Sequence, residues 1–251
     1  MRLLRELVRL LGLLLIAALA LQIYFLARVA LMARVDPSST TFQRTQAVRL
    51  LQRDQRLAWN QTWMSLRDMG AALPRAVIAS EDAGFVEHRG LEWEAIQKAR
   101  ERNERRQSQA SRQTGTSGSA GKPERLMGGS TITQQLAKNL FLSGERTYWR
   151  KGQEAVITWA LETCLSKSRI LEIYLNSVEW GEGVYGAQAA AEHYFRTEPQ
   201  KLQALQAARL AVMLPAPRRF ERLPNSPYLA GRAETIAARM PAVALPEGLR
   251  R

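Results

Sequence analysis

Residues 154–175 read EAVITWALETCLSKSRILEIYL and indicate the fold class most directly. Apolar residues recur in this stretch at spacings of three and four, the period of a helix with one buried face. They are Ala155, Val156, Trp159, Ala160, Cys164 and Leu165, followed by Ile170, Ile173, Tyr174 and Leu175. A polar break at residues 166–168 separates the two groups. The stretch therefore predicts two consecutive α-helices.

Helical patterns also dominate the sequence on both sides of this stretch. Residues 132–139, 187–195 and 202–214 are further helix candidates. The last of them stops at Pro215, because proline lacks the backbone donor that a helix interior needs. No strand alternation and no internal repeat are evident. We therefore expect a mostly α fold with one domain outside the N-terminal segment.

Composition narrows the class of protein. The chain has 251 residues, 46% of them hydrophobic, and one cysteine, Cys164. These values exclude a disordered tail and a disulfide scaffold. The mean hydropathy of −0.27 excludes a membrane protein with many spans. The 36 basic and 23 acidic residues give a net charge of +13. Such an excess indicates an anionic partner, which could be phosphate, nucleic acid or an anionic membrane surface.

The N-terminal segment contains one long uncharged run. Residues 10–27 read LLGLLLIAALALQIYFLA, and about 18–20 apolar residues span a bilayer. Arg2, Arg5 and Arg9 precede the run, which favours a cytoplasmic N-terminus and an exported remainder. We expect an uncleaved transmembrane anchor at residues 10–33. The alternatives are a signal peptide cleaved after residues 18–20 (Ala-Leu-Ala) and a buried helix of a soluble domain.

These features divide the chain into five parts. We expect a cytoplasmic N-terminus (1–9), the anchor (10–33), a linker and membrane-proximal region (34–73), a catalytic-type domain (74–238) and a C-terminal tail (239–251). Residues 106–123 are rich in Ser, Gly and Gln and predict a flexible insert in the domain. A functional loop and a simple solvated insertion are equally good interpretations of that insert.

Glu81 and Asp82 directly follow an apolar run, Ala-Val-Ile-Ala-Ser, and precede Phe85, His88 and Gly90. A carboxylate surrounded by apolar groups has a raised pKa and can exchange protons near neutral pH. This pattern predicts an acid–base residue. The alternative is a pair of ordinary surface acids.

Residues 128–135 read GGSTITQQ and precede a predicted helix. Ser130 or Thr131 could cap that helix, with Gln134 near a capping-box position. Glycines before a helix N-terminus form a ready anion site, and Lys138 follows two turns later. A merely capped helix explains the Ser and the Gln but not the whole run.

Arg150, Lys151 and Glu154 bring two cations and a carboxylate onto neighbouring turns of the predicted helix. Positions i and i+4 share a face, so Arg150 and Glu154 could form an ordinary surface ion pair. The alternative is a phosphate clamp beside a second acid.

Taken together, these patterns resemble the five motifs of the peptidoglycan glycosyltransferases, glycosyltransferase family 51. The matching residues occur in the family's order over residues 74–220. They are Glu81, Asp82, Phe85, His88 and Gly90; Gly129, Ser130, Thr131, Ile132, Thr133, Gln134, Gln135, Lys138 and Asn139; Arg150, Lys151 and Glu154; Arg169, Ile170, Leu171, Glu172, Tyr174, Leu175, Asn176 and Gly181; and Gly186, Ala190, Ala191, Tyr194, Phe195, Leu214, Pro215 and Pro217. The chain departs from the family at Met127, where a basic residue is common, and in its longer insert.

The resemblance implies a fold and an activity. The fold would be a lysozyme-like, two-lobed helical domain preceded by one transmembrane helix. The activity would be polymerisation of lipid II into β-1,4-linked glycan with inversion and release of undecaprenyl pyrophosphate. One anchor, one such domain and no transpeptidase motif resemble the monofunctional members. The enzyme would lie in the bacterial inner membrane with a periplasmic catalytic domain.

The resemblance also implies roles for individual residues. Glu81 would be the general base, and Glu154 would assist the leaving pyrophosphate, with a divalent cation (Mg or Mn) as a candidate ligand and no organic cofactor. The residues implied to bind substrate are Asp82, Phe85, His88, Gly90, Gly129, Ser130, Thr131, Gln134, Gln135, Lys138, Asn139, Arg150, Lys151, Glu172, Tyr174 and Asn176.

The partners expected are lipid II, the growing glycan strand, the membrane and proteins of cell division and wall synthesis, without nucleic acid. The rival interpretations are a muramidase-like hydrolase of the same fold, a membrane-anchored scaffold with a decayed site, and a basic nucleic-acid module. The cations at positions 138, 150 and 151 argue against the hydrolase, because a finished glycan carries no pyrophosphate.

Overall fold

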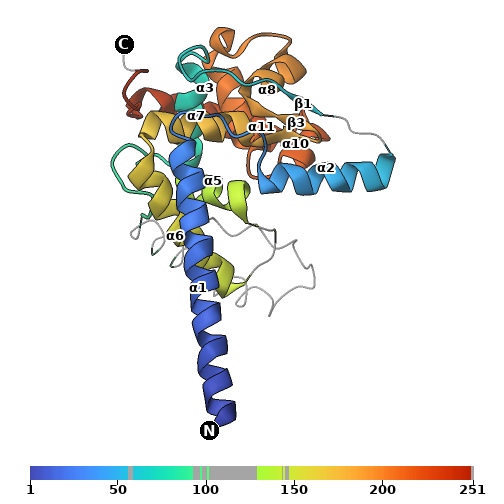
Figure 1. The fold of residues 1–251 in the computed structure, drawn as a ribbon. Helices are drawn as coiled ribbons and strands as arrows, with labels where there is room; N and C mark the ends of the chain where they lie inside the picture. Colours follow the sequence, from blue (N-terminus) through green and yellow to red (C-terminus); the bar gives the residue numbers. More distant parts are fainter. Residues whose placement is uncertain are drawn as a thin grey trace, which may run out of the picture.

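The structure is a computed structural model. It describes residues 1–55, 59–92, 129–142 and 147–249, together with residues 97, 101 and 144. The insert expected at residues 106–123 and the departure at Met127 lie outside the described residues. The described part is mostly α-helical (Figure 1), as the sequence predicts.

The described residues form ten α-helices, two 3-10 turns and three short strands. The helices are α1 (Arg2–Leu31), α2 (Thr41–Asp54), α3 (Ala72–Glu81), α5 (Ile132–Phe141), α6 (Tyr148–Cys164), α7 (Lys167–Ser177), α8 (Gly186–Phe195), α9 (Ala204–Met213), α10 (Pro217–Glu221) and α11 (Pro227–Arg239), with 3-10 turns at Pro199–Lys201 and Met240–Ala242. The strands are β1 (Asn60–Gln61), β2 (Glu179–Gly181) and β3 (Val184–Tyr185).

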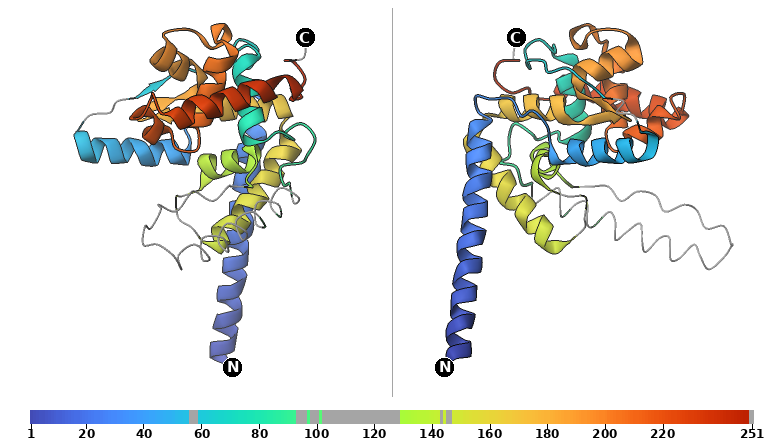
Figure 2. Two further views of the ribbon diagram at one scale, coloured as in Figure 1. Left: turned by 180° about the vertical axis from the view of Figure 1, so that it is seen from behind. Right: turned by 45° about the vertical axis from the view of Figure 1, so that its right-hand side comes forward.

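Helix α1 is the one described helix that is long and apolar enough to cross a membrane. All side chains of residues 1–21 are exposed, and this part of α1 extends away from the rest of the chain (Figure 2). The second part of α1 packs on the domain, where Val29 and Met32 are buried. The apolar run predicted as an anchor therefore has two parts, a free part and a docked part.

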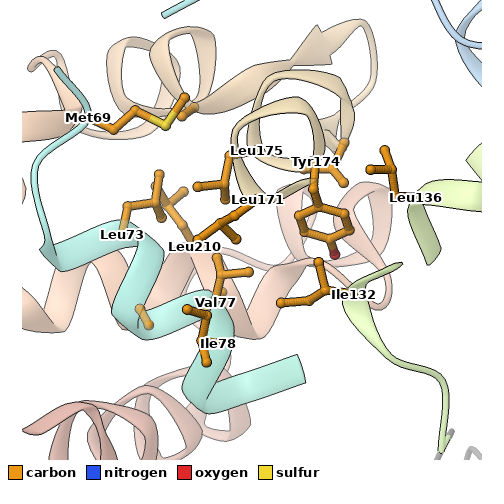
Figure 3. Close-up of a cluster of buried hydrophobic side chains, with 14 of the residues drawn as sticks. Met69, Leu73, Val77, Ile78, Ile132, Leu136, Leu171, Tyr174, Leu175 and Leu210 are labelled. Atoms are coloured by element: carbon orange, nitrogen blue, oxygen red, sulfur yellow. The ribbon is translucent and has the colours of Figure 1, made fainter. Parts of the chain in front are cut away.

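The core lies where α3, α5, α7 and α9 meet (Figure 3). Helix α3 packs against α9 and α11, and Leu73, Val77 and Ile78 have no exposed surface. Pro74 lies in the first turn of α3, where the missing backbone donor costs little. The core therefore fixes the C-terminal end of α3, which carries Glu81, beside α5 and α7.

Local capping signals determine where the helices around the core begin. Thr131, Thr147 and Ser166 are the N-caps of α5, α6 and α7, and each side chain accepts a backbone N–H of the first turn. The predicted break at residues 166–168 therefore contains the start of α7. Helix α9 ends at Met213, shortly before Pro215, also as predicted.

The apolar stripe predicted on α6 is only partly buried. Of the predicted residues, Ala160 and Leu165 are buried, whereas Val156 and Trp159 are exposed. The most buried apolar residues of α6 are Ile157 and Leu161, which the predicted stripe did not include. The exposed pair belongs to the face of α6 that lies beside α1, around a cavity of about 150 Å³ between the two helices. Tyr148 at the start of α6 is exposed as well. Exposed aromatic and aliphatic side chains beside an apolar helix are typical of a membrane interface.

A small sheet and an ordered C-terminus were not predicted. The strand order is β1-β3-β2, with β1 parallel and β2 antiparallel to β3. Strands of two or three residues are too short to show alternation. Residues 239–251 were expected as a tail, but Val243 and Leu245 are buried, and Arg75 donates to the Val243 carbonyl oxygen at 3.4 Å. This segment packs on the domain as far as it is described.

Candidate active site

Glu81 is the last residue of α3, and a chain of hydrogen bonds orients its carboxylate. The Nε2 atom of Gln135, on α5, donates to Glu81 Oε2 at 2.8 Å. The Oε1 atom of Gln135 in turn accepts the hydroxyl proton of the buried Tyr174, on α7, at 2.9 Å. Among the described residues no hydrogen bond reaches Glu81 Oε1. That oxygen is therefore available to a ligand.

The pKa of Glu81 is raised above its usual value, mainly because burial penalises the charged form. The charge of Asp82 adds to the increase. The hydrogen bond from Gln135 and the charges of Lys138 and Arg232 act in the opposite direction. A carboxyl group with a raised pKa holds a proton more readily than an ordinary carboxylate, as a general base must once it has accepted one.

Asp82 supports the site through hydrogen bonds to the protein. Its Oδ2 atom accepts the backbone N–H of Ile132, the first residue of α5, at 3.0 Å. His88 Nδ1 accepts the N–H of Gly90 at 3.0 Å, so the ring proton is on Nε2, which donates to Asp82 Oδ1 at 2.8 Å. Phe85 lies beneath this loop with no exposed surface. The resemblance implied that Asp82, Phe85 and His88 bind substrate, but in the structure they position the loop and α5.

A hydrogen bond between Gly90 and Thr131 links this loop to the start of α5. The φ of Gly90 is +81°, and an added Cβ would lie 2.7 Å from Thr158 Cγ2, so no other residue fits. The Gly90 carbonyl oxygen accepts the Thr131 hydroxyl proton at 2.6 Å. Thr131 and Gln134 form the predicted capping box and are both buried. These three residues build the site and do not line its surface.

A second cluster lies on the first turns of α6. The carboxylate of Glu154 is buried and is held by the Arg150 guanidinium at 2.9 Å and by the Lys151 ammonium. Arg150 Nε is buried and has no hydrogen-bond partner among the described residues. An unpaired buried donor is costly, so the arrangement favours an incoming acceptor. The predicted pairing of Arg150 with Glu154 is thus present.

Lys138, on α5, is within electrostatic range of both Glu81 and Glu154. Partial desolvation by the surrounding protein lowers its pKa, although the side chain still reaches the surface. The charges of Glu154 and Glu81 raise this pKa, and those of Arg150 and Lys151 lower it further. The charges of both carboxylates and of both cations therefore act on Lys138, and α5 packs directly against α6. We treat the two clusters as parts of one candidate site.

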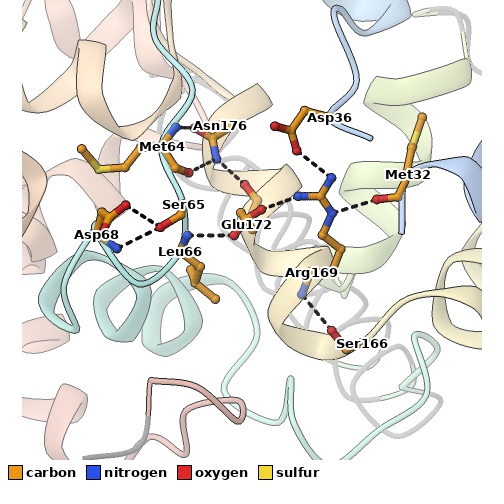
Figure 4. Close-up of polar contacts among 10 residues, drawn as sticks. All are labelled: Met32, Asp36, Met64, Ser65, Leu66, Asp68, Ser166, Arg169, Glu172 and Asn176. Carbon is orange, nitrogen blue, oxygen red and sulfur yellow. Dashed lines mark hydrogen bonds and ion pairs between the residues drawn. The ribbon is translucent and has the colours of Figure 1, made fainter. Parts of the chain in front are cut away.

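Three polar residues of α7, Arg169, Glu172 and Asn176, bind other segments of the chain (Figure 4). Glu172 Oε2 accepts the N–H of Leu66 at 2.8 Å, and the other oxygen of Glu172 pairs with Arg169. Asn176 has no exposed surface. Its amide donates to the Met64 carbonyl oxygen at 2.8 Å and accepts the Met64 N–H at 2.9 Å. Glu172 and Asn176, implied as substrate contacts, hold the segment that precedes α3.

The other implied residues remain at or near the surface. Those with some exposure are Gly129, Ser130, Gln135, Lys138, Asn139, Arg150 and Lys151. All of them lie on α5, on α6 or directly before α5. Tyr174 is buried and reaches the site only through Gln135. His88 and Glu172 keep some exposure, but their polar atoms bind other parts of the protein.

The residues do not fit a resident divalent cation as they are arranged. Glu154, the candidate ligand, is already neutralised by two cations. Asp82, His88 and Glu92 bring three potential ligand atoms within 4.8 Å of one another. However, both ring nitrogens of His88 are already used, one as a donor and one as an acceptor. We therefore derive no catalytic step through a metal.

Sequence reasoning missed Arg232, on α11. Its charge lowers the pKa of Glu81, so it lies within electrostatic range of the carboxylate. A single arginine in a distant amphipathic helix gives no signal in the sequence. Only the packing of α11 against α3 brings it near the site.

We expect Asn176→Leu to destabilise the protein by about 1–3 kcal/mol, because it removes the buried amide that pairs with the N–H and the carbonyl oxygen of the partly buried Met64. Thermal unfolding of the detergent-purified protein measures this loss. The KM of the folded fraction should stay unchanged. A higher KM at an unchanged melting temperature would instead make Asn176 a substrate contact.

Comparisons with known proteins identify the family. A family model described as transglycosylase matches residues 49–241. A biosynthetic peptidoglycan transglycosylase of Paraburkholderia xenovorans is 51% identical over 232 residues, which cover 92% of this chain and 90% of the relative. Relatives with the same description occur in Burkholderia pseudomallei (50% identity; 92% and 84% covered) and Bordetella pertussis (46%; 91% and 90%). From the match over most of its length, the chain belongs to the transglycosylase family.

Proposed function

We propose that the chain elongates glycan by joining lipid II units, with inversion and with undecaprenyl pyrophosphate as the leaving group. The chain is a peptidoglycan glycosyltransferase, an enzyme that polymerises glycan strands in cell-wall synthesis. The finer proposal rests on one observation: Glu81, with its raised pKa, shares a site with the cations of α5 and α6.

Glu81 acts as the general base in this proposal. Gln135 holds Oε2, so Oε1 takes the proton of the acceptor's 4-hydroxyl group. The acceptor oxygen then attacks the anomeric carbon of the donor while the bond to the pyrophosphate oxygen breaks. Attack opposite an α-linked pyrophosphate yields a β-1,4 bond. A positioned base contributes about 10²–10⁴-fold to the rate.

The cations stabilise the leaving group. Negative charge accumulates on the pyrophosphate as its bond to the sugar breaks, and Lys138, Arg150 and Lys151 offset that charge. The unpaired Arg150 Nε gains an acceptor when a phosphate oxygen binds. Glu154 keeps two of the cations in place before the substrate arrives.

The membrane is the proposed location of the reaction. The apolar helix α1 suggests a single-pass anchor. Arg2, Arg5 and Arg9 favour a cytoplasmic N-terminus, which puts the domain on the outer side of the bacterial inner membrane. Proteins of cell division and wall synthesis are the proposed partners, and an exported domain does not meet chromosomal DNA.

Polymerisation of fluorescent lipid II by the detergent-purified protein tests the proposal. We expect long glycan strands with β-1,4 linkages and one undecaprenyl pyrophosphate released per bond formed. Release of sugars from finished cell wall, without polymerisation, would contradict it and favour a hydrolase. A folded protein that forms no product in either assay would also contradict it.

A further inference from the structure

One face of α1 is built into the domain. Gln22, Phe25, Val29 and Met32 follow one another at spacings of three and four, so they share a face. Gln22 and Phe25 are partly buried, and Val29 and Met32 are buried, whereas every side chain of residues 1–21 is exposed. Figure 1 shows α1 running beside α6 before it continues alone. The second part of α1 is thus a docked helix and not a free tether.

This face contacts three helices, each of which carries part of the active site. Phe25 packs edge-on against Phe141 at the end of α5, with ring centroids 5.2 Å apart. Gln22 reaches Gln153 on α6. The Nε atom of Arg169, on α7, donates to the carbonyl oxygen of Met32 at 2.8 Å.

The contact between Gln22 and Gln153 is reciprocal. Each amide donates to the other's oxygen, at 3.0 and 3.1 Å. An amide on an apolar helix is costly without a partner, so the pair strongly favours one arrangement of α1 against α6. Gln153 directly precedes Glu154 and lies one turn from Arg150. The pair therefore holds the part of α6 that carries the cations.

Arg169 fixes the other end of the docked face (Figure 4). Besides the Met32 carbonyl oxygen, its guanidinium binds Asp36 Oδ1 at 2.7 Å and pairs with Glu172. These partners come from the end of α1, the following turn and α7. The planar guanidinium can satisfy all three at once, which an ammonium group cannot do.

We propose that Gln22 and Arg169 are positioning residues: through them, the anchor sets the place of Arg150, Lys151 and Glu154 relative to the membrane. The proposal rests on the proposed function, because a pyrophosphate attached to a membrane lipid lies at a fixed depth. If α1 were joined to the domain only through a flexible linker, the cation cluster could move towards or away from the membrane. Because α1 packs on the domain, the cluster stays at one depth.

Cross-linking tests the docking without reference to activity. In a Cys164→Ser background, Gln22→Cys and Gln153→Cys are joined in membranes by a short bifunctional reagent with two thiol-reactive ends, which forms one thioether bond to each cysteine. The control pair is Leu21→Cys with Gln153→Cys, because Leu21 is exposed. We expect intramolecular cross-linking of the first pair and much less of the second. Equal cross-linking of the two pairs, or none of the first, would overturn the docking.

Kinetics test the positioning role. We expect Gln22→Leu to raise the KM for lipid II about tenfold, the scale of one interhelical hydrogen bond in a membrane, with an unchanged kcat. The double variant Gln22→Leu/Gln153→Leu should be no worse than either single variant, because it leaves no amide unpaired. Leu21→Ala should behave as the wild type.

Arg169→Lys should raise the KM in the same way as Gln22→Leu. A lower kcat at unchanged KM, with a lower melting temperature, would show a merely structural role and overturn the proposal. If the wild-type protein did not polymerise lipid II, the proposed function would fail, whereas the cross-linking result would still report on docking.

Discussion

Glu81→Gln is expected to reduce the rate of polymerisation strongly and to raise the melting temperature at neutral pH. The loss of activity should reach about 10²–10⁴-fold, because the variant has no base for the acceptor hydroxyl group. Gln135 can still donate to the new amide oxygen, so the local structure should persist. Activity and stability therefore move in opposite directions, as is common where an active-site charge is buried.

The gain in stability follows from the raised pKa of Glu81. The folded state binds this proton more tightly than the unfolded state, so stability falls as the pH rises from the ordinary carboxyl pKa through the raised one. Above that window the ionised carboxylate destabilises the folded protein, and Gln removes this penalty. The melting temperatures of the variant and the wild type should therefore differ most at neutral pH and least at acidic pH.

The matched control is Glu87→Gln, an exposed carboxylate in the loop that follows α3. It should leave both activity and melting temperature near the wild-type values. Polymerisation at the wild-type rate in Glu81→Gln would remove Glu81 as the base. A lower melting temperature in that variant would contradict the raised pKa.

Glu154→Gln is expected to lower kcat by about 10²–10³-fold, the scale seen when one stabilising group is removed from a developing anion. Without the carboxylate, Arg150 and Lys151 repel each other and turn towards solvent. The charge of Glu154 also raises the pKa of Lys138, so its removal lowers that pKa. The alkaline limb of kcat should therefore move to lower pH, because Lys138 must be charged to stabilise the leaving group.

Two further variants distinguish this account from misfolding. Lys138→Met leaves the ion pairs of Glu154 with Arg150 and Lys151 intact. It should nevertheless remove the alkaline limb of kcat, which we assign to Lys138. Glu234→Gln, an exposed site on α11, is the control and should change nothing. If the alkaline limb of Glu154→Gln stayed at the wild-type pH, Glu154 would not influence the pKa of Lys138. That result would contradict the claim that the two residues belong to one site.

The sequence predicted those parts of the fold that depend on local signals. The start of α5 at its capping box, the break before α7 and the end of α9 before Pro215 each follow from residues within one turn. The long apolar helix was evident from composition alone. Glu81 and the α6 cluster stood out because their residue types and spacing are unusual for packing.

The supporting roles depend on partners that are distant in the chain. Asn176 looks like a surface amide in the sequence, but its partner is Met64, in a segment without a periodic pattern. Glu172 likewise binds Leu66. Gln22 reads as a polar interruption of an apolar run until α6 supplies Gln153. Tertiary packing, which local patterns do not encode, decides whether such residues contact substrate or protein.

The acidic limb of kcat/KM, followed in the wild type and in Gln135→Leu, tests the central claim most directly. The claim is that Glu81 is the base and that its environment sets its pKa. The Gln135 hydrogen bond lowers the pKa of Glu81, so its loss should raise it and move the acidic limb to higher pH. Asn139→Ala, on the same helix, should leave the limb in place. A limb at the same pH in Gln135→Leu would contradict the account, because another group would then control the proton.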